Sequence, residues 1–466
     1  MLKQRIRDPL HDLIEFNPSE LERTLWKVVQ TRPFQRLRRV KQLGFSEFVY
    51  PGASHTRFAH SIGVFHTARE LMSVVKRNAS EDGISKELRA LAAALVHDLG
   101  HGPFSHAFEE VGRRLGLKLA DHENMSDVLI RNSEVAEVLN ELGSGFANDV
   151  ADIIQKNGVK TVQHAVVSSQ FDADRLDYMR RDRLMTGTQH SAIDFSWLIA
   201  NLEIGKVNIG VDDKSIGTVD TFVLGPKAIH AAETYVLGLF QLYPTVYFHK
   251  ATRGAEKIFS ELLVKVVGLV RDGSQSATGL PVNHPLIRFA ENPDDISVAL
   301  NLDDTVIWGA LTQMIESTDS LVSELSCRLR DRKLFKCVDI RSDVANVFDP
   351  QRRNTDDIIE KIDKCCIGIK AKLNEWEEAH GKIRPRLLID EADRSPYKPI
   401  GQSRGPLERI NVRTEGGALV DLNERSTVVA ALKKFKLFRA YADRDDADAQ
   451  DAVKRIVEGE ILSCHQ

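Results

Sequence analysis

Three histidines and one aspartate fall within ten residues in the stretch Ala93-Ala-Leu-Val-His97-Asp98-Leu-Gly100-His101-Gly-Pro103-Phe-Ser-His106. The apolar run from Leu91 to Val96 favours a buried helix, and this predicts that His97 and Asp98 lie in its last turn before Gly100 ends it. Imidazole and carboxylate side by side suit Mn, Fe, Zn or Mg. A buried helix that ends in solvated polar residues is the alternative, and distant parts of the chain must decide between them.

The bulk composition is that of a folded globular protein. A chain of 466 residues can hold two or three domains, and its contents of 42% hydrophobic and 28% charged residues are ordinary for a globular fold. The net charge of −4 gives no overall attraction to nucleic acid or to an anionic membrane. An anionic substrate therefore needs a local pocket.

Cysteine usage and hydropathy indicate the compartment. The five cysteines are odd in number and lack the spacing of a zinc finger, which predicts reduced thiols. The N-terminal residues contain no apolar core like that of a signal peptide, and no run of about 18 apolar residues occurs. We therefore expect a cytoplasmic protein with no membrane partner.

The first forty residues predict an extended lead followed by two helices. Ile6 to His11 form the lead, and Ser19 can cap a helix that begins at Glu20. Beyond Pro33, apolar residues recur at helical spacing and leave the arginines of Arg36–Arg39 on other faces. Those arginines could bind phosphate or nucleic acid, or simply form a solvated basic face.

A second polar group follows the turn at Pro51-Gly52. Ser54 can cap the next helix, which places Arg57 and His60 three residues apart on one face. A guanidinium for phosphate and an imidazole for metal would then lie side by side. Taken alone, His60 is equally well explained as a hydrogen-bonded histidine of the core.

Later histidines suit proton transfer. A predicted helix over Phe104 to Leu115 brings His106 and Glu109 onto one face, since they are three residues apart. His122 opens the following helix, where an imidazole is partly desolvated yet near solvent and can serve as an acid or base. A capping or surface role is the alternative for His122.

A charged helix from Phe171 to Asp182 supplies further carboxylates. Asp174, Asp177 and Tyr178 lie one helical turn apart, with Arg175 and Asp182 beside them. Such a helix is usually a solvated surface. However, His60 and the His97-Asp98 pair lie upstream. An aspartate of this helix would complete with them the four ligands that a metal site built on helices requires.

The fold class expected from these patterns is mainly α. Residues 203–225 alternate and contain an Asp-Asp-Lys turn, which predicts a small β-hairpin insertion. From about residue 386, prolines and glycines frame short extended pieces, and residues 427–442 predict a helix or a helix and a strand. The expected organisation is a helical core at 1–260, a helical extension at 261–385 and a small α+β region at 386–466.

Five blocks of sequence occur in order along the chain: Pro33–Arg38, Lys41–Gly44, Pro51–His60, His97–His106 and Asp172–Tyr178. Together they resemble the HD-domain phosphohydrolases, and in particular the branch of deoxynucleoside triphosphate triphosphohydrolases. The resemblance runs from about Ile6 to about Lys257 and weakly through the C-terminal tail, and it implies a helical HD core.

The resemblance implies one divalent ion per site, with Mn or Mg favoured over Fe or Zn. Its ligands would be His60, His97, Asp98 and Asp174. Such an ion polarises a phosphoryl group and lowers the pKa of a bound water. In this branch, attack at the α-phosphorus releases the nucleoside and triphosphate, and the catalytic residues implied for protonating the leaving oxygen are His106, Glu109 and His122.

The resemblance also implies the substrate contacts. Arg57 and His101 would bind the α-phosphate, Arg175 and Tyr178 the phosphates, and Gln42 and Asp182 the sugar 3′-hydroxyl. Leu43 would pack under the sugar, and Tyr247 would stack against the sugar or close the pocket. A small apolar contact such as Leu43 disfavours a 2′-hydroxyl only modestly.

Two residues depart from the pattern of the branch. Leu239 stands where an arginine that binds the terminal phosphate is expected, and leucine cannot replace a bidentate phosphate contact. Gln30 stands where activator-dependent relatives carry an acid that binds guanine, although Gln35 and Arg38 match that allosteric site. A nucleotide activator and assembly into a dimer or tetramer are therefore expectations, with guanine the less favoured activator.

Three functions follow from these observations. The leading one is hydrolysis of dNTPs to deoxynucleoside and triphosphate. The second is hydrolysis of another nucleotide, a monophosphate or a cyclic or signalling nucleotide, which Leu239 motivates. The third is a scaffold that senses nucleotides or binds nucleic acid without turnover, which the complete set of predicted ligands disfavours.

Overall fold

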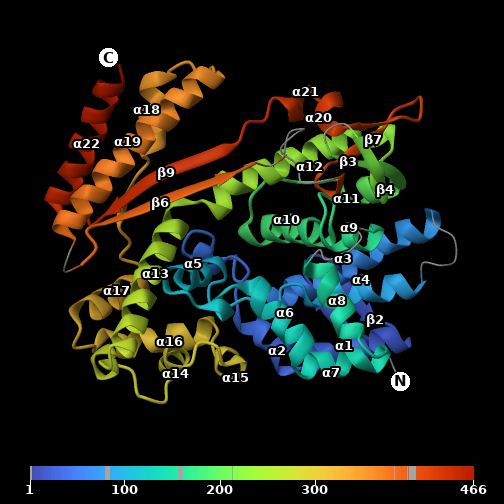
Figure 1. Cartoon of the computed structure of the whole chain (residues 1–466), viewed down its shortest axis with the longest axis horizontal. Coiled ribbons are helices and arrows are strands. Elements are labelled where there is room, and N and C mark those ends of the chain that lie inside the picture. Colours follow the sequence, from blue (N-terminus) through green and yellow to red (C-terminus); the bar gives the residue numbers. More distant parts are fainter. Residues whose placement is uncertain are drawn as a thin grey trace. The chain divides into compact units, whose positions relative to one another are not determined.

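The computed structural model describes residues 3–78, 84–155, 161–211, 214–381, 384–395, 397 and 406–465. The chain divides into two compact units that interleave along the sequence (Figure 1). The first unit comprises Met1–Val246, Pro281–Gly309 and Pro396–Lys433, and the second comprises Tyr247–Leu280, Ala310–Ser395 and Lys434–Gln466. The region beyond residue 386 contributes residues to each of the two units, whereas the sequence predicts three consecutive segments. As folding domains, those segments stay a prediction.

The first unit is mainly helical, which confirms the predicted fold class. Its helices are α1 (Glu20–Gln30), α2 (Arg32–Arg36), α3 (Arg57–Asn78), α4 (Ile84–Val96), α5 (His106–Leu115), α6 (His122–Asn132), α7 (Glu134–Leu139), α8 (Phe146–Gln155), α9 (Val162–Val167), α10 (Ala173–Thr186), α11 (Phe195–Ala200), α12 (Ile229–Leu242), α14 (Pro285–Glu291), α15 (Ile296–Ala299), α20 (Leu422–Arg425) and α21 (Thr427–Ala430). Short 3-10 turns include η1 (Leu37–Arg39) and η2 (Gly44–Phe48). Helix α16 (Asp304–Ile315) begins in this unit.

Helix α3 lies at the centre of the first unit and packs against both α4 and α10. The residues from Ala90 to Val96 at the end of α4 are all buried, as their apolar sequence predicts. Ser19 caps α1 by accepting a hydrogen bond from the Glu22 amide at 3.2 Å, which confirms the predicted cap. The end of α4 and the inward faces of α3 and α10 therefore meet in the core.

Two small sheets complete the first unit. Strands β1 (Gln4–Asp8) and β2 (Asp12–Phe16) form an N-terminal antiparallel hairpin. The predicted insertion is confirmed as β3 (Leu202–Val211) and β4 (Lys214–Leu224), although two residues of its expected turn, 212 and 213, lie outside the described residues. Strand β4 also pairs in parallel with β7 (Asn411–Arg413), which continues to β8 (Leu419–Asp421).

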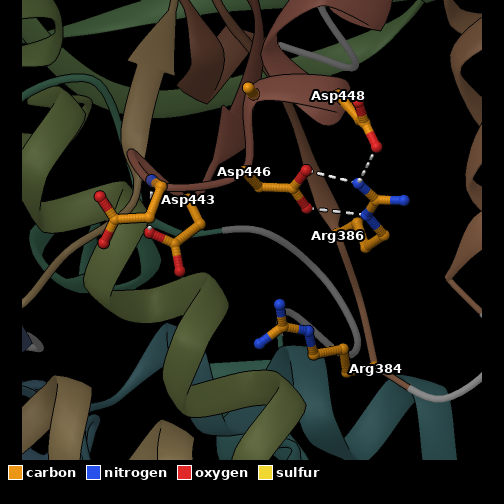
Figure 2. Close-up of a pocket in the computed structure, with 7 residues that line it drawn as sticks. Arg384, Arg386, Asp443, Asp446 and Asp448 are labelled. Carbon is orange, nitrogen blue, oxygen red and sulfur yellow. Dashed lines mark hydrogen bonds and ion pairs between the residues drawn. The ribbon is translucent and has the colours of Figure 1, made fainter.

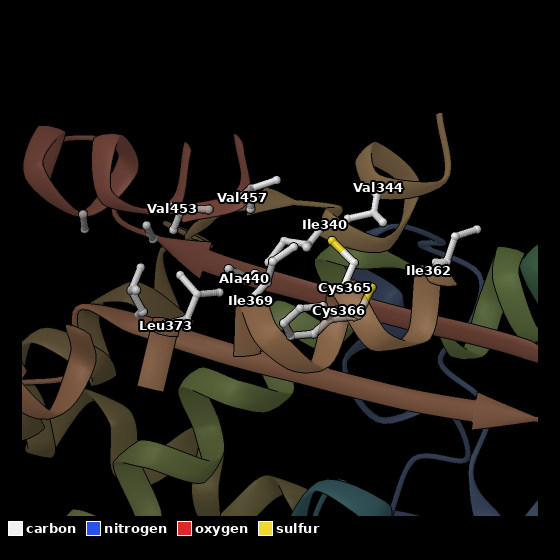
Figure 3. Close-up of a cluster of buried hydrophobic side chains, with 14 residues drawn as sticks. Ile340, Val344, Ile362, Cys365, Cys366, Ile369, Leu373, Ala440, Val453 and Val457 are labelled. Atoms are coloured by element: carbon white, nitrogen blue, oxygen red, sulfur yellow. The ribbon is translucent and has the colours of Figure 1, made fainter. Parts of the chain in front are cut away.

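The second unit builds helices around a three-stranded antiparallel sheet of order β5-β9-β6. The strands are β5 (Lys336–Val338), β6 (Leu387–Arg394) and β9 (Phe435–Ala442), so residues 427–442 form a short helix and then a strand. Its helices are α13 (Lys250–Arg271), α17 (Ser320–Arg330), α18 (Ile340–Phe348), α19 (Asp356–His380) and α22 (Ala447–His465). Helices α18, α19 and α22 share one hydrophobic cluster with the sheet (Figure 3).

The Ile369→Ala variant is expected to lose about 3 kcal/mol of unfolding free energy, because it removes buried methyl and methylene groups and leaves a cavity. Ile369 lies on α19 in the middle of this cluster and is fully buried (Figure 3). Urea denaturation followed by circular dichroism measures the loss. The exposed neighbour Ile367 is the matched control, since its side chain is 69% accessible and Ile367→Ala should change stability by less than about 0.5 kcal/mol.

Two sequence expectations concern the whole chain. All five cysteines are free thiols, as their number and spacing predict. Among the described residues, no helix combines the length and the apolar character needed to cross a membrane.

Candidate metal and phosphate site

The four predicted ligands come from α3, from the turn after α4 and from α10; because α4 ends at Val96, His97 and Asp98 follow the helix instead of lying in its last turn. His60 lies on α3, His97 and Asp98 lie in the turn that follows α4, and Asp174 lies on the first turn of α10. One ligand atom from each of His60, His97 and Asp98 lies within 4.8 Å of the other two. Oδ1 of Asp174 is 3.0 Å from Nε2 of His60 and 3.6 Å from Nε2 of His97. The structure therefore brings all four side chains together.

The hydrogen bonds of the two imidazoles fit a metal ion. Nδ1 of His97 is 2.9 Å from the carbonyl of Ala94, so it carries the proton and leaves a lone pair on Nε2. Nε2 of His97 is buried and has no hydrogen-bond partner in the described part of the chain. Nδ1 of His60 is 2.9 Å from Oδ2 of Asp177, which directs the second Nε2 lone pair toward the same place.

The charges around these imidazoles also favour a cation. Burial alone would lower the pKa of His60, but hydrogen bonds to Asp174 and Asp177 outweigh burial and raise it to about 10. The pKa of His97 is raised as well, because attraction by Asp98 and Asp174 outweighs burial. Positive charge between these side chains can be supplied by a proton or by a divalent ion.

Arg57 and His101, the residues predicted to contact the α-phosphate, both lie beside Asp98. Arg57 is buried; its Nη1 donates to Oδ2 of Asp98 and its Nε donates to Oγ of Ser105 at 2.8 Å. Nε2 of His101 lies 3.4 Å from Oδ1 of Asp98. Burial and the neighbouring Arg57 and His122 keep the pKa of His101 well below its ordinary value, so it is a neutral imidazole.

Glu109 joins two histidines beside this group. Its carboxylate binds Nδ1 of His122 and lies 3.1 Å from Nδ1 of His106. The side chain of His122 is 24% exposed and its ring stacks on His101 with centroids 4.1 Å apart, whereas His106 is 71% exposed. Burial lowers the pKa of His122, but the hydrogen bond to Glu109 outweighs burial and raises it. The raised pKa favours the protonated form of the His122 imidazole, which lies beside His101.

The loop that carries His101 has an unusual backbone. Phe104 and Ser105 both have φ of +53°, a left-handed conformation that costs energy in residues other than glycine. Helix α5 consequently begins at His106, so the predicted start at Phe104 was wrong. Likewise α3 begins at Arg57, and the Ala59 amide lies 3.5 Å from Oγ1 of Thr56 instead of being capped by Ser54.

Two buried charged residues hold this loop in place. Arg36 donates to the carbonyls of His101 at 2.7 Å and Leu302 at 2.9 Å. Asp304 accepts from the amides of Phe104 at 2.8 Å and Lys41 at 2.9 Å. The loop geometry thus depends on hydrogen bonds from two segments far apart in the sequence.

The Arg36→Met variant is expected to lose about 3 kcal/mol of stability, because methionine fills the volume but leaves buried carbonyl groups without donors. Chemical denaturation measures the loss. Arg39→Met is the control, since Arg39 pairs with Asp303 from a side chain that is 48% exposed. Equal stability losses in the two variants would contradict the assigned role of Arg36.

The remaining predicted substrate residues have diverse surroundings. Oε1 of Gln42 is buried and finds no hydrogen-bond partner within the described ranges, so it can accept from a ligand. Oδ1 of Asp182 accepts from the buried His55 at 2.8 Å. Arg175 donates through Nη1 to the carbonyl of Ser169 at 2.5 Å, so part of its guanidinium is bound within the protein.

Other residues of the predicted pocket stay predictions as substrate contacts. Leu43 precedes η2 and is partly buried. Burial and the nearby Tyr243 raise the pKa of Tyr178 well above its ordinary value, so its hydroxyl remains a donor. Tyr247 ends the π-helical segment Tyr243–Tyr247 and belongs to the second unit.

The two residues that depart from the pattern of the branch, Leu239 and Gln30, lie in different surroundings. Leu239 on α12 is only 4% exposed and packs in the core of the first unit. Gln30, at the end of α1, is exposed. Gln35 accepts from Nε of Arg38 at 2.9 Å, and that guanidinium lies 3.5 Å from the ring centroid of Phe58. The two residues that match the allosteric pattern therefore lie together.

Sequence reasoning did not find the residues that hold the site together. In the sequence, Asp177 is one of several acids on its helix. No pattern marks His11 as its partner, His55 as the partner of Asp182, or Arg36 as a donor to the His101 carbonyl. One local signal was available, because Asp177 and Arg181 are four residues apart and an acid-to-arginine pair at that spacing forms an ion pair on a helix.

The second unit has a separate pocket of about 380 Å³, shown in Figure 2. It is lined by Arg384, Arg386, Asp443, Asp445, Asp446, Ala447 and Asp448. Arg386 binds Asp446 through Nε at 2.7 Å, and Arg384 binds Glu324 at 3.0 Å. With both arginines paired and four aspartates present, this pocket does not suit an anionic nucleotide.

Comparison with known proteins agrees with this site. The model of the HD domain matches residues 57–179, a range that includes all four predicted metal ligands. A solved phosphohydrolase from Bacteroides thetaiotaomicron is similar with a TM-score of 0.70 and 26% identity, covering 95% of this chain and all of that chain.

Curated relatives extend the similarity beyond that domain. The uncharacterized protein YwfO of Bacillus subtilis is 33% identical over 430 residues, which cover 91% of this chain and 88% of YwfO. The mouse deoxynucleoside triphosphate triphosphohydrolase SAMHD1 is 28% identical over 375 residues, or 72% of this chain, but the chain spans about half (54%) of that protein's length. The chain therefore belongs to the HD-domain phosphohydrolases, with deoxynucleoside triphosphate triphosphohydrolases among its relatives.

Proposed function

We propose that the protein hydrolyses dNTPs to deoxynucleoside and triphosphate with the help of a divalent ion, Mn or Mg. The observation that carries this proposal is the cluster of His60, His97 and Asp98 beside the Glu109–His122 pair. A site for a cation next to a protonated imidazole is what phosphoester hydrolysis needs. The choice of dNTPs is supported by the activity named for the mouse relative.

Each side chain has a distinct task in the proposed reaction. When bound, the ion supplies charge neutralisation at the phosphoryl oxygens and a more acidic water. Arg57 and neutral His101 donate to the α-phosphate, on which negative charge accumulates during attack. His122, kept protonated by Glu109, delivers a proton to the leaving 5′-oxygen of the deoxynucleoside.

A nucleotide panel tests the proposal. Purified protein is incubated with each dNTP and with mixtures, in Mn²⁺ or Mg²⁺, and the products are separated by chromatography. Deoxynucleoside and triphosphate in equal amounts, lost after treatment with EDTA, support the proposal. Their absence from every dNTP and mixture would contradict it. His230→Ala is the control, because this histidine lies on α12 with its side chain 95% exposed.

A second candidate is hydrolysis of a different nucleotide, favoured by the burial of Leu239 where a phosphate-binding arginine was expected. A monophosphate or a cyclic nucleotide lacks the γ-phosphate that such an arginine would bind. The same panel distinguishes this function, since inorganic phosphate, pyrophosphate or a linearised nucleotide would replace triphosphate. An activating nucleotide and a dimer or tetramer belong to the proposal, and the mixtures together with light scattering test them.

A further inference from the structure

Asp177 is a buried carboxylate that the proposed chemistry does not use. Its side chain is completely inaccessible and accepts hydrogen bonds on both oxygens. Oδ2 lies 2.9 Å from Nδ1 of His60 and 2.8 Å from Nε of Arg181. Oδ1 lies 2.7 Å from Nε2 of His11 and 3.0 Å from Nη2 of Arg181. Four donors from three elements therefore fix the position of this one carboxylate.

The N-terminal hairpin supplies one of these donors. His11 lies in the turn between β1 and β2, and its side chain is only 3% exposed. Oδ1 of Asp8 accepts from the amides of Leu10 at 2.9 Å and His11 at 3.0 Å, which shapes the turn. Oδ2 of Asp8 also pairs with Nη1 of Arg181 at 2.8 Å. The turn therefore contacts Asp177 directly through His11, and indirectly through Asp8, which binds the same Arg181 that Asp177 binds.

Helix α3 makes room for this arrangement at Gly63, one turn after His60. A Cβ atom at Gly63 would lie 2.1 Å from Oδ1 of Asp177 and 2.2 Å from Nη2 of Arg181. Neither group could keep its place against a side chain there. The lack of a side chain at Gly63 therefore lets α3 lie close to the Asp177–Arg181 ion pair of α10.

We propose that Asp177 is a positioning residue for the metal site, held in turn by His11 of the N-terminal hairpin. By accepting the Nδ1 proton of His60, Asp177 keeps the lone pair of Nε2 directed at the metal and increases its basicity. This inference rests on the proposed metal-dependent function. It assigns a task to the Asp8–His11 turn, which the reaction itself leaves unused.

A structural ion pair is the competing explanation, and Asp8 provides the matched control. Asp8 and Asp177 are both buried and both bind Arg181, but among the described contacts only Asp177 reaches His60. Asp8→Asn and Asp177→Asn therefore weaken the same arginine pair. Only Asp177→Asn loses charge beside His60, and its amide can donate where the carboxylate accepted, which favours the wrong tautomer of the imidazole.

The experiment titrates the whole purified protein, freed of metal, with Mn²⁺ alone and follows free Mn²⁺ by electron paramagnetic resonance. Asp177→Asn should weaken Mn²⁺ binding about 10- to 100-fold, and Asp8→Asn by less than about threefold. Urea unfolding should show similar stability losses in both variants. His11→Phe keeps an aromatic ring but removes the donor to Oδ1, and should weaken binding by an intermediate factor of about five.

The outcomes separate this inference from the proposed function. Mn²⁺ binding by Asp177→Asn as tight as that of the wild type would overturn the positioning role while leaving the metal site intact. Equal losses of Mn²⁺ binding in Asp8→Asn and Asp177→Asn would also overturn it, in favour of a purely structural pair. A wild-type protein that binds no divalent ion would overturn the proposed function itself, and the inference with it. His11→Phe leaves the carboxylate in place and so tests the same contacts with less disturbance of folding.

Discussion

The double variant His97→Ala, Asp98→Ala should bind no divalent ion and hydrolyse nucleotides at least about a thousandfold more slowly than the wild type. The variant removes from the cluster one carboxylate and one imidazole whose Nε2 has no hydrogen-bond partner among the residues that the structure describes. It also leaves the buried guanidinium of Arg57 without its carboxylate partner. The variant is therefore expected to lose the cation and to leave Arg57, the proposed contact to the α-phosphate, without the carboxylate that positions it.

Two measurements check this result on the same sample. Metal content after dialysis against Mn²⁺ is determined by mass spectrometry, and product formation is followed by chromatography. Circular dichroism must first show that the variant is folded, since Asp98 is buried. A folded variant that retained a full complement of metal would place the ion elsewhere. Nucleotide binding that persisted unchanged, in a wild-type protein without turnover, would favour a scaffold over an enzyme.

The Glu109→Gln variant should lower kcat/KM about 100-fold and move the alkaline limb of the pH profile of kcat/KM to lower pH. The pKa of His122 is raised because the hydrogen bond and charge of Glu109 outweigh the effect of burial. A general acid works only while protonated, so the rate falls as the pH rises through the pKa of His122. Without the carboxylate, burial lowers that pKa and the fall begins at lower pH.

The measurement is kcat/KM between about pH 5 and pH 9, because this parameter reports groups of the free enzyme. Glu110→Gln changes the adjacent glutamate on α5 and serves as the control for removing a charge from that helix. An unchanged alkaline limb in Glu109→Gln would show that a group other than His122 sets it.

Much of the site was predictable from the sequence because it is encoded in short blocks. His97 and Asp98 follow an apolar run that can only be a buried segment, and the structure buries that run completely. The separate His60 and the charged helix from Phe171 to Asp182 suggested the rest of a four-ligand set, and the resemblance to a family singled out Asp174 among the acids of that helix. Helical periodicity likewise identified the pair of His106 and Glu109, which are 3.1 Å apart.

The supporting contacts were not predictable because they join residues far apart in the chain. His11 and Asp177 are separated by 166 positions, and Arg36 reaches a carbonyl 266 positions away. A short polar segment such as the N-terminal turn looks like any surface turn until its partner is known. Similarly, the left-handed backbone at Phe104 is imposed by tertiary hydrogen bonds, which override the helix propensity of the following residues.

The interleaving of the two units limits how the protein can be cut. The chain passes from one unit to the other at residues 246/247, 280/281, 309/310, 395/396 and 433/434. A truncated chain ending near residue 246 would lose β7, the parallel neighbour of β4, and Asp304, which binds the amide of Phe104. The HD domain therefore cannot be excised as a continuous fragment with its support intact, and its last contacts form only after most of the chain has left the ribosome.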